Sequence, residues 1–320
     1  MLEKVKKTYR AFRIYYDDFR RDMKYSTLLT GYNTQEKVLS RLVVEAHTIE
    51  KGLTMPEKKP VFGREKVLTI IGLCENYLRM SYDKTDPRFV YVLGILNEYK
   101  GYHQGIADMK DVTLKIDNLT SKVNGGKIED IRQTYSIRSE DYFADKNSPF
   151  DIFARSRHSC RNLSEPVDEV TLWKALDLSM TAPSTCNRQS HRVHILQSDD
   201  AKQKILEIQS GNRGFGHLVD KFILVTSDLS DWPGGHQRNA PYVDGGIYVM
   251  NLLYSLHQYG IAACTLNLYL DVNRTQKLHQ NLDIPENEVP IALIAVGKTP
   301  DKVDIALSKR RDIREVVKTH

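Results

Sequence analysis

The chain has 320 residues, of which 41% are hydrophobic and 27% are charged, with 18 Gly, 11 Pro and 4 Cys. This composition excludes a disordered, collagen-like or disulfide-stapled chain, and the length predicts two domains or one domain with a large appendage. The net charge of +5 comes from residues 1–150 and is spread along predicted helices, which favours a solvated surface over a nucleic-acid-binding face.

The N-terminal residues 1–24 contain eight Lys or Arg and no long apolar stretch. We therefore expect no secretory signal and a cytoplasmic location. Residues 245–270 lack Asp, Glu, Lys and Arg, but polar residues interrupt them. This segment predicts a buried helix followed by a buried strand and no membrane span. The four cysteines are too far apart for a CxxC pair, so we expect reduced, mostly buried thiols and no zinc site.

Residues 1–110 have the apolar spacing of helices. Asn33 followed by Glu36 resembles a capping box, and the apolar residues after it predict a helix that ends near Gly52. Further helices are expected at 64–82 and 87–104, with a loop at 55–63. An aromatic stripe lies near the start of the chain, and we expect it to pack against the C-terminal half. Its members are Tyr9, Phe12, Tyr15, Tyr16 and Phe19.

One polar group in this region has two interpretations. His47 and Lys51 are four residues apart, with Glu50 between them. The three side chains either form a polar site on one face of the helix or mark a solvated helix end, and we favour the solvated end.

Residues 110–150 are polar and contain Gly125 and Gly126, so we place the domain junction there. The predicted domains are a helical N-terminal region at 1–145 and a second domain at 146–320. In the second domain Asp168 is expected to cap a helix, whose predicted apolar side consists of Val170, Trp173, Leu176 and Met180. Strands are expected at 193–196, 222–226, 262–266 and 291–296, and helices at 201–208 and 244–259.

One glycine-rich run and one pair of histidines do not predict a nucleotide-binding or metal site. The run Gly211–Gly216 follows a helical pattern instead of a strand, so it lacks the context of a dinucleotide-binding loop. His191 and His194 are three apart in a predicted strand and therefore point to opposite faces, which argues against a metal pair. No metal site is predicted.

Three separate segments carry more specific chemistry. Arg157–Arg161 places two guanidiniums, an imidazole and a hydroxyl within five residues, which suits a phosphate, although an exposed charged turn has the same pattern. Ala182–Gln189 offers backbone donors, hydroxyls and an amide, or is simply a helix terminator. Lys309–Arg311 is a basic cluster that is also typical of a solvated end.

In their order and spacing these segments resemble the nitroreductase family of FMN-dependent oxidoreductases. The family pattern has an Arg-Arg-Ser-x-Arg run, followed about 24 residues later by Ala-Pro-Ser-x-x-Asn-x-Gln and a strand. The resemblance continues through Asp244-Gly245-Gly246 and Cys264–Asn267 to Lys309–Arg311. The helical half, including His47–Leu53, is similar to longer members associated with polysaccharide biosynthesis.

The resemblance implies an α+β fold, with a nitroreductase-like mixed sheet wrapped by helices and an all-α N-terminal region. It implies FMN bound at a homodimer interface, NADH or NADPH as electron donor and a small organic acceptor, with the hydride carried by the flavin N5 and no catalytic side chain. The implied cofactor-binding residues are Arg157, His158, Ser159, Arg161, Pro183, Ser184, Thr185, Asn187, Gln189, Thr265, Leu266, Lys309 and Arg311.

The sequence departs from the family pattern at three positions. His158 replaces an Arg, Ser190 replaces a Pro, and Asn267 stands where some members have an acidic residue. These differences affect the expected substrate range more than FMN binding. The alternative function is a non-catalytic flavin-binding or scaffold component of a biosynthetic complex.

Overall fold

The computed structural model describes residues 1–124 and 132–320, and it divides into two compact units. The sheet unit contains Met1–Asp18 and Ile137–Val303, and the helical unit contains Phe19–Ser136 and Asp304–His320. The chain therefore passes between the units three times. Each unit is described by itself below.

The helical unit is built on helices that bury one apolar face each. Its core contains Leu39 and Leu42 of α3, Ile70 of α4 and Leu96 of α5, all fully buried. The helices described are α2 (Thr27–Thr30), α3 (Gln35–Leu53), α4 (Arg64–Arg79), α5 (Pro87–Tyr102), α6 (Lys110–Asn124) and α13 (Ile313–Val316), with a 3₁₀ turn at Ala107–Met109. Strands β1 (Thr134–Arg138) and β6 (Lys302–Ala306) pair with each other.

Local chemistry explains where these helices begin and end. The predicted helices at 64–82 and 87–104 and the loop before them are confirmed, each with a slightly earlier end. Asp86 caps α5 by accepting from Arg88 N, and Pro87 occupies the first turn. The predicted Asn33 cap is wrong, because Thr34 accepts from Lys37 N instead. The hydroxyl one position later is the group that reaches a free amide of the first turn.

Residues 110–124, at the start of the 110–150 stretch in which we expected the domain junction, belong to the helical core. Val112, Ile116 and Leu119 are fully buried. The glycine pair Gly125 and Gly126 lies outside the described residues.

The sheet unit has a four-stranded sheet in the order β2-β3-β5-β4. The expected strands are all confirmed, as β2 (His191–Leu196), β3 (Lys221–Asp228), β4 (Ala262–Leu266) and β5 (Glu288–Gly297). The register places Leu224 opposite both His194 and Leu293, and a bulge follows Val225. The α+β class is confirmed, but the described pairs of this sheet are antiparallel throughout where a mixed sheet was expected.

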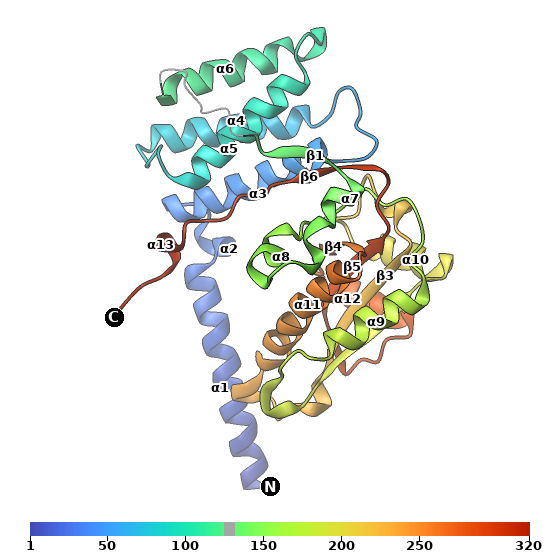
Figure 1. Cartoon of the computed structure of the whole chain (residues 1–320). Helices are drawn as coiled ribbons and strands as arrows, with labels where there is room; N and C mark the ends of the chain where they lie inside the picture. The colour runs from blue at the N-terminus through green and yellow to red at the C-terminus, as the bar shows by residue number, and fades with distance from the viewer. Residues whose placement is uncertain (125–131) are drawn as a thin grey trace. The chain divides into compact units, whose positions relative to one another are not determined.

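Helices cover this sheet, as Figure 1 shows. Side chains of α9 (Glu169–Ser179) and α11 (Ala240–Gln258) pack with β3 and β5 in one buried cluster. The remaining elements are α7 (Ser139–Tyr142), α8 (Phe150–Ser156), α10 (Asp199–Ile208), α12 (Val272–Leu282) and 3₁₀ turns at Ala144–Asn147, Thr185–Asn187, Gly216–Leu218, Leu229–Asp231 and Gly235–Gln237. Among the described residues, no helix has both the length and the apolar character needed to cross a membrane.

The face of α9 differs from the expectation. Asp168 caps the helix as predicted, accepting from Thr171 N at 2.9 Å. However, Val170, Trp173 and Met180 are at least half exposed, and the buried residues are Leu172, Ala175, Leu176 and Ser179. Because this helix is apolar on several sides, its spacing alone did not identify the buried side.

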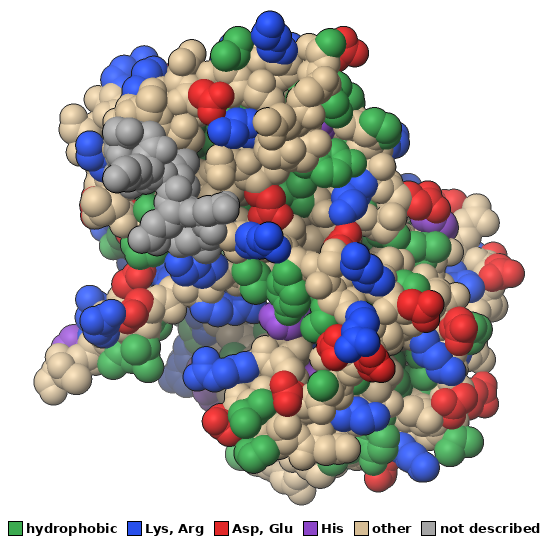
Figure 2. Space-filling model, turned by 45° about the horizontal axis from the view of Figure 1, so that its top comes forward, with side chains coloured by type: hydrophobic (Ala, Val, Ile, Leu, Met, Phe, Trp, Pro, Cys, Tyr) green, Lys and Arg blue, Asp and Glu red, His purple; other side chains and the backbone are tan. Residues whose placement is uncertain are grey.

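The expected packing of the N-terminal aromatic stripe is also wrong. Helix α1 (Leu2–Tyr25) contains no buried residue, and all five aromatic side chains of the stripe are more than half exposed. Other side chains of α1 make its contacts: Asp18 forms an ion pair with Arg238, and Ile14 lies beside Gly235. Charged side chains of both signs are intermixed on the face shown in Figure 2, as expected for a solvated surface.

Candidate cofactor site

The Arg157–Arg161 segment, which we call the arginine segment, follows α8 and runs beside β4. Cys160 N donates to Ala263 O at 3.0 Å. Tyr142 Oη donates to His158 O at 2.6 Å, which fixes the middle of the segment. The segment is therefore an ordered part of the sheet unit and not a loose charged turn.

In the part of the chain that the structure describes, the two guanidiniums of this segment lack counter-charges. Arg161 is only 7% exposed, and no carboxylate among the described residues lies within ion-pair distance of Arg157 or Arg161. Within residues 1–124 and 132–320, Arg157 Nε is buried without a hydrogen-bond partner. A buried cation without an anion is strongly destabilising, so this arrangement suits a bound anionic ligand.

His257, at the end of α11, adds to this environment. Burial, followed by the charges of Arg157 and His158, lowers the pKa of His257 to about 4, so the imidazole is neutral at pH 7. Its Nε2 lies 2.9 Å from Ser156 Oγ. Sequence reasoning did not identify His257, and its place in a charge-free apolar segment was the only available signal.

The second predicted segment forms a strained turn between α9 and β2, and we call it the serine turn (Pro183–Gln189). Cys186, Asn187 and Gln189 have left-handed φ values of 52°, 57° and 52°. Such values are uncommon for non-glycine residues and concentrate at functional sites. Ser184 Oγ accepts from Gln189 N at 3.0 Å, and Asn187 Oδ1 accepts from Gln189 Nε2 at 3.0 Å.

Asp244 of α11 holds this turn in place. Its carboxylate accepts from both the backbone N and the hydroxyl of Thr185, each at 2.8 Å. The next residue is Gly245, where a Cβ atom would lie 2.7 Å from Ile291 Cγ1, so only glycine allows this approach. Asp244 was part of the sequence pattern but was not predicted as a site residue.

The two segments lie at opposite ends of α11. Asp244 contacts the serine turn and His257 borders the arginine segment, and their separation of 13 positions corresponds to roughly 20 Å of helix. Thr265 and Leu266 lie on β4, which the arginine segment accompanies; Thr265 is exposed and Leu266 is buried. Within one sheet unit, therefore, the predicted site residues form two separate groups.

Lys309 and Arg311 belong to the helical unit. Arg311 forms ion pairs with Glu36 at 3.6 Å and with Glu315 at 3.9 Å. Both basic side chains line a pocket near His47.

The favoured interpretation of His47, Glu50 and Lys51 as a solvated helix end is wrong, because Glu50 is fully buried. Its carboxylate lies 2.7 Å from His47 Nδ1 and accepts from Tyr91 Oη at 2.8 Å. The sequence pattern placed His47 and Glu50 on one helix face but did not show what covers them.

The family model that matches this chain covers part of the sheet unit. Residues 154–212 match the family model described as Nitroreductase family. Three similar solved structures are a nitroreductase family protein from Clostridium difficile (22% identity over 52% of this chain and 95% of that chain, TM-score 0.43), an FMN-dependent nitroreductase from the same organism (18%, 46% and 86%, 0.40) and a nitroreductase family protein from Streptococcus pneumoniae (18%, 54% and 100%, 0.46). The stretch that resembles the nitroreductase family contains both the arginine segment and the serine turn.

Proposed function

We propose that this chain is an FMN-dependent oxidoreductase that takes two electrons from NADH or NADPH and passes them to an organic acceptor. The observation that supports this best is the buried, uncompensated guanidinium of Arg161, inside the segment that matches the nitroreductase family. A phosphate monoester carries close to two negative charges at neutral pH and accepts several charge-assisted hydrogen bonds. Arg157, Ser159 and Arg161 suit such a group.

The serine turn suits the rest of the cofactor. Its left-handed residues turn backbone groups away from a regular ladder, while Asp244 fixes the turn. We propose that Pro183, Ser184, Thr185, Asn187 and Gln189 line the ring and ribityl, with Thr265 and Leu266 near the reactive edge. Bound FMN would supply the two-electron chemistry, and the chain's part is to bind and orient it.

The separation of the two groups supports a homodimer. About 20 Å of α11 lies between them. We propose that the arginine segment of one protomer and the serine turn of its partner hold the same FMN. Light scattering of the purified protein tests this, and an FMN-loaded monomer would contradict it.

Two parts of the proposal, the role of Lys309 and Arg311 and the association with polysaccharide biosynthesis, rest on the resemblance alone. Lys309 and Arg311 are proposed to assist phosphate binding, although Arg311 already pairs with Glu36. The cytoplasmic location and the association with polysaccharide biosynthesis remain predictions. An FMN titration of Lys309→Ala tests the role of Lys309, and we expect this variant to bind FMN more weakly.

The experiment that tests the function begins with an absorbance spectrum. We expect the purified protein to be yellow, and mass spectrometry of the released ligand to identify FMN. Anaerobic addition of NADH or NADPH should then bleach the flavin absorbance, which separates an enzyme from a flavin-binding scaffold. No flavin after incubation with excess FMN would refute the proposal.

A matched pair of variants tests the phosphate site. Arg161→Ala removes the buried guanidinium, whereas Arg155→Ala removes an exposed one just outside the segment. Losing one charge-assisted contact costs about 1.5–3 kcal/mol, so we expect Arg161→Ala to weaken FMN binding roughly 10- to 150-fold. Fluorescence titration measures both affinities, and equal values for the two variants would show that Arg161 does not hold the cofactor.

A further inference from the structure

Helix α1 presents a continuous apolar face to solvent. Leu2, Val5, Tyr9, Phe12 and Tyr16 are between 55% and 72% exposed. Their spacing alternates between three and four residues, which keeps them on one side of the helix. We call this side the outer face of α1. A soluble protein seldom leaves such a continuous apolar stripe open to water, so the outer face marks a surface that another molecule covers.

The opposite side of α1 contacts the rest of the sheet unit. Ala11 and Ile14 are partly buried, and Ile14 lies beside Gly235. Because a helix turns about 100° per residue, Ile14 lies almost opposite Phe12. The sheet unit therefore holds α1 with the outer face directed away from that unit.

Basic side chains border the outer face. Residues 1–16 contain five Lys or Arg and a single acidic residue, Glu3, which pairs with Lys7 at 3.2 Å. The other four cations are exposed and have no carboxylate partner in the part of the chain that the structure describes; they are Lys4, Lys6, Arg10 and Arg13. Lys6 and Arg13 are seven residues apart, so they lie on the same flank of the face.

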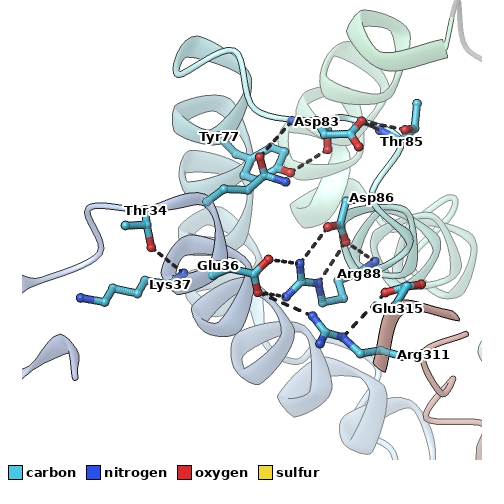
Figure 3. A network of polar contacts seen from close by, with 11 residues as sticks. Thr34, Glu36, Lys37, Tyr77, Asp83, Thr85, Asp86, Arg88, Arg311 and Glu315 are labelled. Carbon is cyan, nitrogen blue, oxygen red and sulfur yellow. Dashed lines mark hydrogen bonds and ion pairs between the residues drawn. The ribbon is translucent and has the colours of Figure 1, made fainter. Parts of the chain in front are cut away.

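One cluster of cations in the helical unit shows the contrast. Figure 3 shows Glu36 between the guanidiniums of Arg88 and Arg311, and Asp86 also pairs with Arg88 at 2.8 Å. Those cations are neutralised by carboxylates of their own unit. The four cations of α1 make no such pair, and their gathering around an apolar face is the charge pattern of a helix that binds an anionic surface.

The charges also argue against a second copy of α1 on the outer face. In a parallel pair of these helices, Lys6 and Arg13 would face Met1 and Thr8 of the second copy. In an antiparallel pair, the two basic flanks would lie against each other. Neither arrangement brings a carboxylate to these cations, so a second copy would cover the apolar stripe but leave the charge uncompensated.

The aromatic side chains suit a lipid surface. Tyr9 and Tyr16 each carry a hydroxyl at the end of an apolar ring, and such side chains favour the boundary between lipid headgroups and acyl chains. The ring of Phe12 stacks on that of Tyr16, with centroids 6.0 Å apart. The outer face thus combines an apolar stripe, amphipathic rings and a basic border.

We infer that α1 binds the surface of an anionic lipid bilayer through its outer face. The helix lies in the plane of the surface. Its apolar side chains enter the boundary between headgroups and acyl chains, and the four bordering cations contact lipid phosphates. This inference does not rest on the proposed function.

The test is co-sedimentation of the full-length protein, as purified, with lipid vesicles. One set contains equal parts of phosphatidylglycerol and phosphatidylcholine, and the other contains phosphatidylcholine alone. We expect the protein to sediment with the mixed vesicles and much less with the neutral ones. High salt should weaken the binding, because it screens the attraction between the cations and the lipid phosphates.

Two matched pairs of variants locate the binding. Phe12 and Trp173 are both 63% exposed, so their replacement by alanine removes rings of equal exposure. Phe12→Ala should weaken binding to the mixed vesicles at least about tenfold, because a buried ring is lost, whereas Trp173→Ala should leave it nearly unchanged. Lys6→Gln should weaken binding about fivefold, the contribution of one cation near an anionic surface. Lys174→Gln, at an exposed lysine of α9, should have almost no effect.

Three results would overturn the inference. They are no sedimentation with the mixed vesicles, equal affinities of Phe12→Ala and Trp173→Ala, and equal binding to neutral and mixed vesicles. If vesicles do not bind and light scattering gives Phe12→Ala a lower mass than the wild type, the outer face contacts a second copy instead. Urea unfolding of each variant checks that it is folded. Flavin absorbance of the same samples tests FMN binding separately, so failure of this inference is distinguishable from failure of the proposed function.

Discussion

At the scale of single residues, the buried polar groups carry most of the functional argument. His257 is neutral at pH 7 in the folded chain, because burial, followed by electrostatic effects of Arg157 and His158, lowers its pKa from 6.5 to about 4. In the unfolded chain the ring takes up a proton near its ordinary value. The unfolded state therefore binds more protons between about pH 6.5 and pH 4.

This difference predicts a pH dependence. The free energy of unfolding should fall as the pH falls from about 6.5 to about 4, and the His257 contribution should be absent below that range. His257→Phe keeps an aromatic ring beside Tyr142 and Phe153 but cannot titrate. We expect urea unfolding of this variant to show a flatter profile over the same range. His217→Phe, at an exposed histidine, should keep the wild-type slope, and a wild-type slope in His257→Phe would refute the assignment.

The residue types of the site could be predicted from sequence, but their partners could not. Arg161 and the serine turn were identified by residue order and spacing. Asp244, which holds the turn from 59 positions away, required the fold. Glu50 shows the same limit, because the residue that covers it is 258 positions later. A sequence pattern shows the neighbours along one helix and not those brought in by tertiary structure.

At the scale of elements, the strands and helices were mostly predictable, while the buried faces were less so. The strand at 262–266 matches β4 at both ends, because its apolar run is continuous and bounded by Gly260 and polar residues. Helix α9 was predicted in position and cap but not in orientation. Apolar residues on several sides of one helix leave the choice to its neighbours, here β3 and α11.

The corrected face of α9 gives a stability prediction. Leu172 is 1% exposed and Trp173 is 63% exposed. Leu172→Ala should lower the free energy of unfolding by about 2–5 kcal/mol, because it leaves a cavity in the core. Trp173→Ala, the larger truncation, should change it by no more than about 0.5 kcal/mol. Chemical denaturation of both variants decides the point, and a larger loss in Trp173→Ala would mean that its ring is covered.

At the scale of the whole molecule, ligand linkage should act unequally on the two units. Eleven of the thirteen proposed FMN-binding residues belong to the sheet unit and two to the helical unit. At 100 times its Kd, FMN stabilises the state that binds it by about 2.7 kcal/mol. We therefore expect hydrogen exchange in β3 to slow by about 100-fold, and exchange in α3 to slow by less than about tenfold. Equal protection of both would show that the units unfold together.

The interleaved chain order has a consequence for synthesis. Glu50 emerges early, but Ser308, which donates two hydrogen bonds to it, follows 258 residues later. At about 5–20 residues per second, roughly 13–50 s pass between the two. During that interval the sheet unit's 137–303 segment is made in full, while the Glu50 carboxylate of α3 still lacks the two hydrogen bonds from Ser308. The helical unit is begun early and completed last, so the nascent chain exposes an unfinished charged core throughout the folding of the other unit.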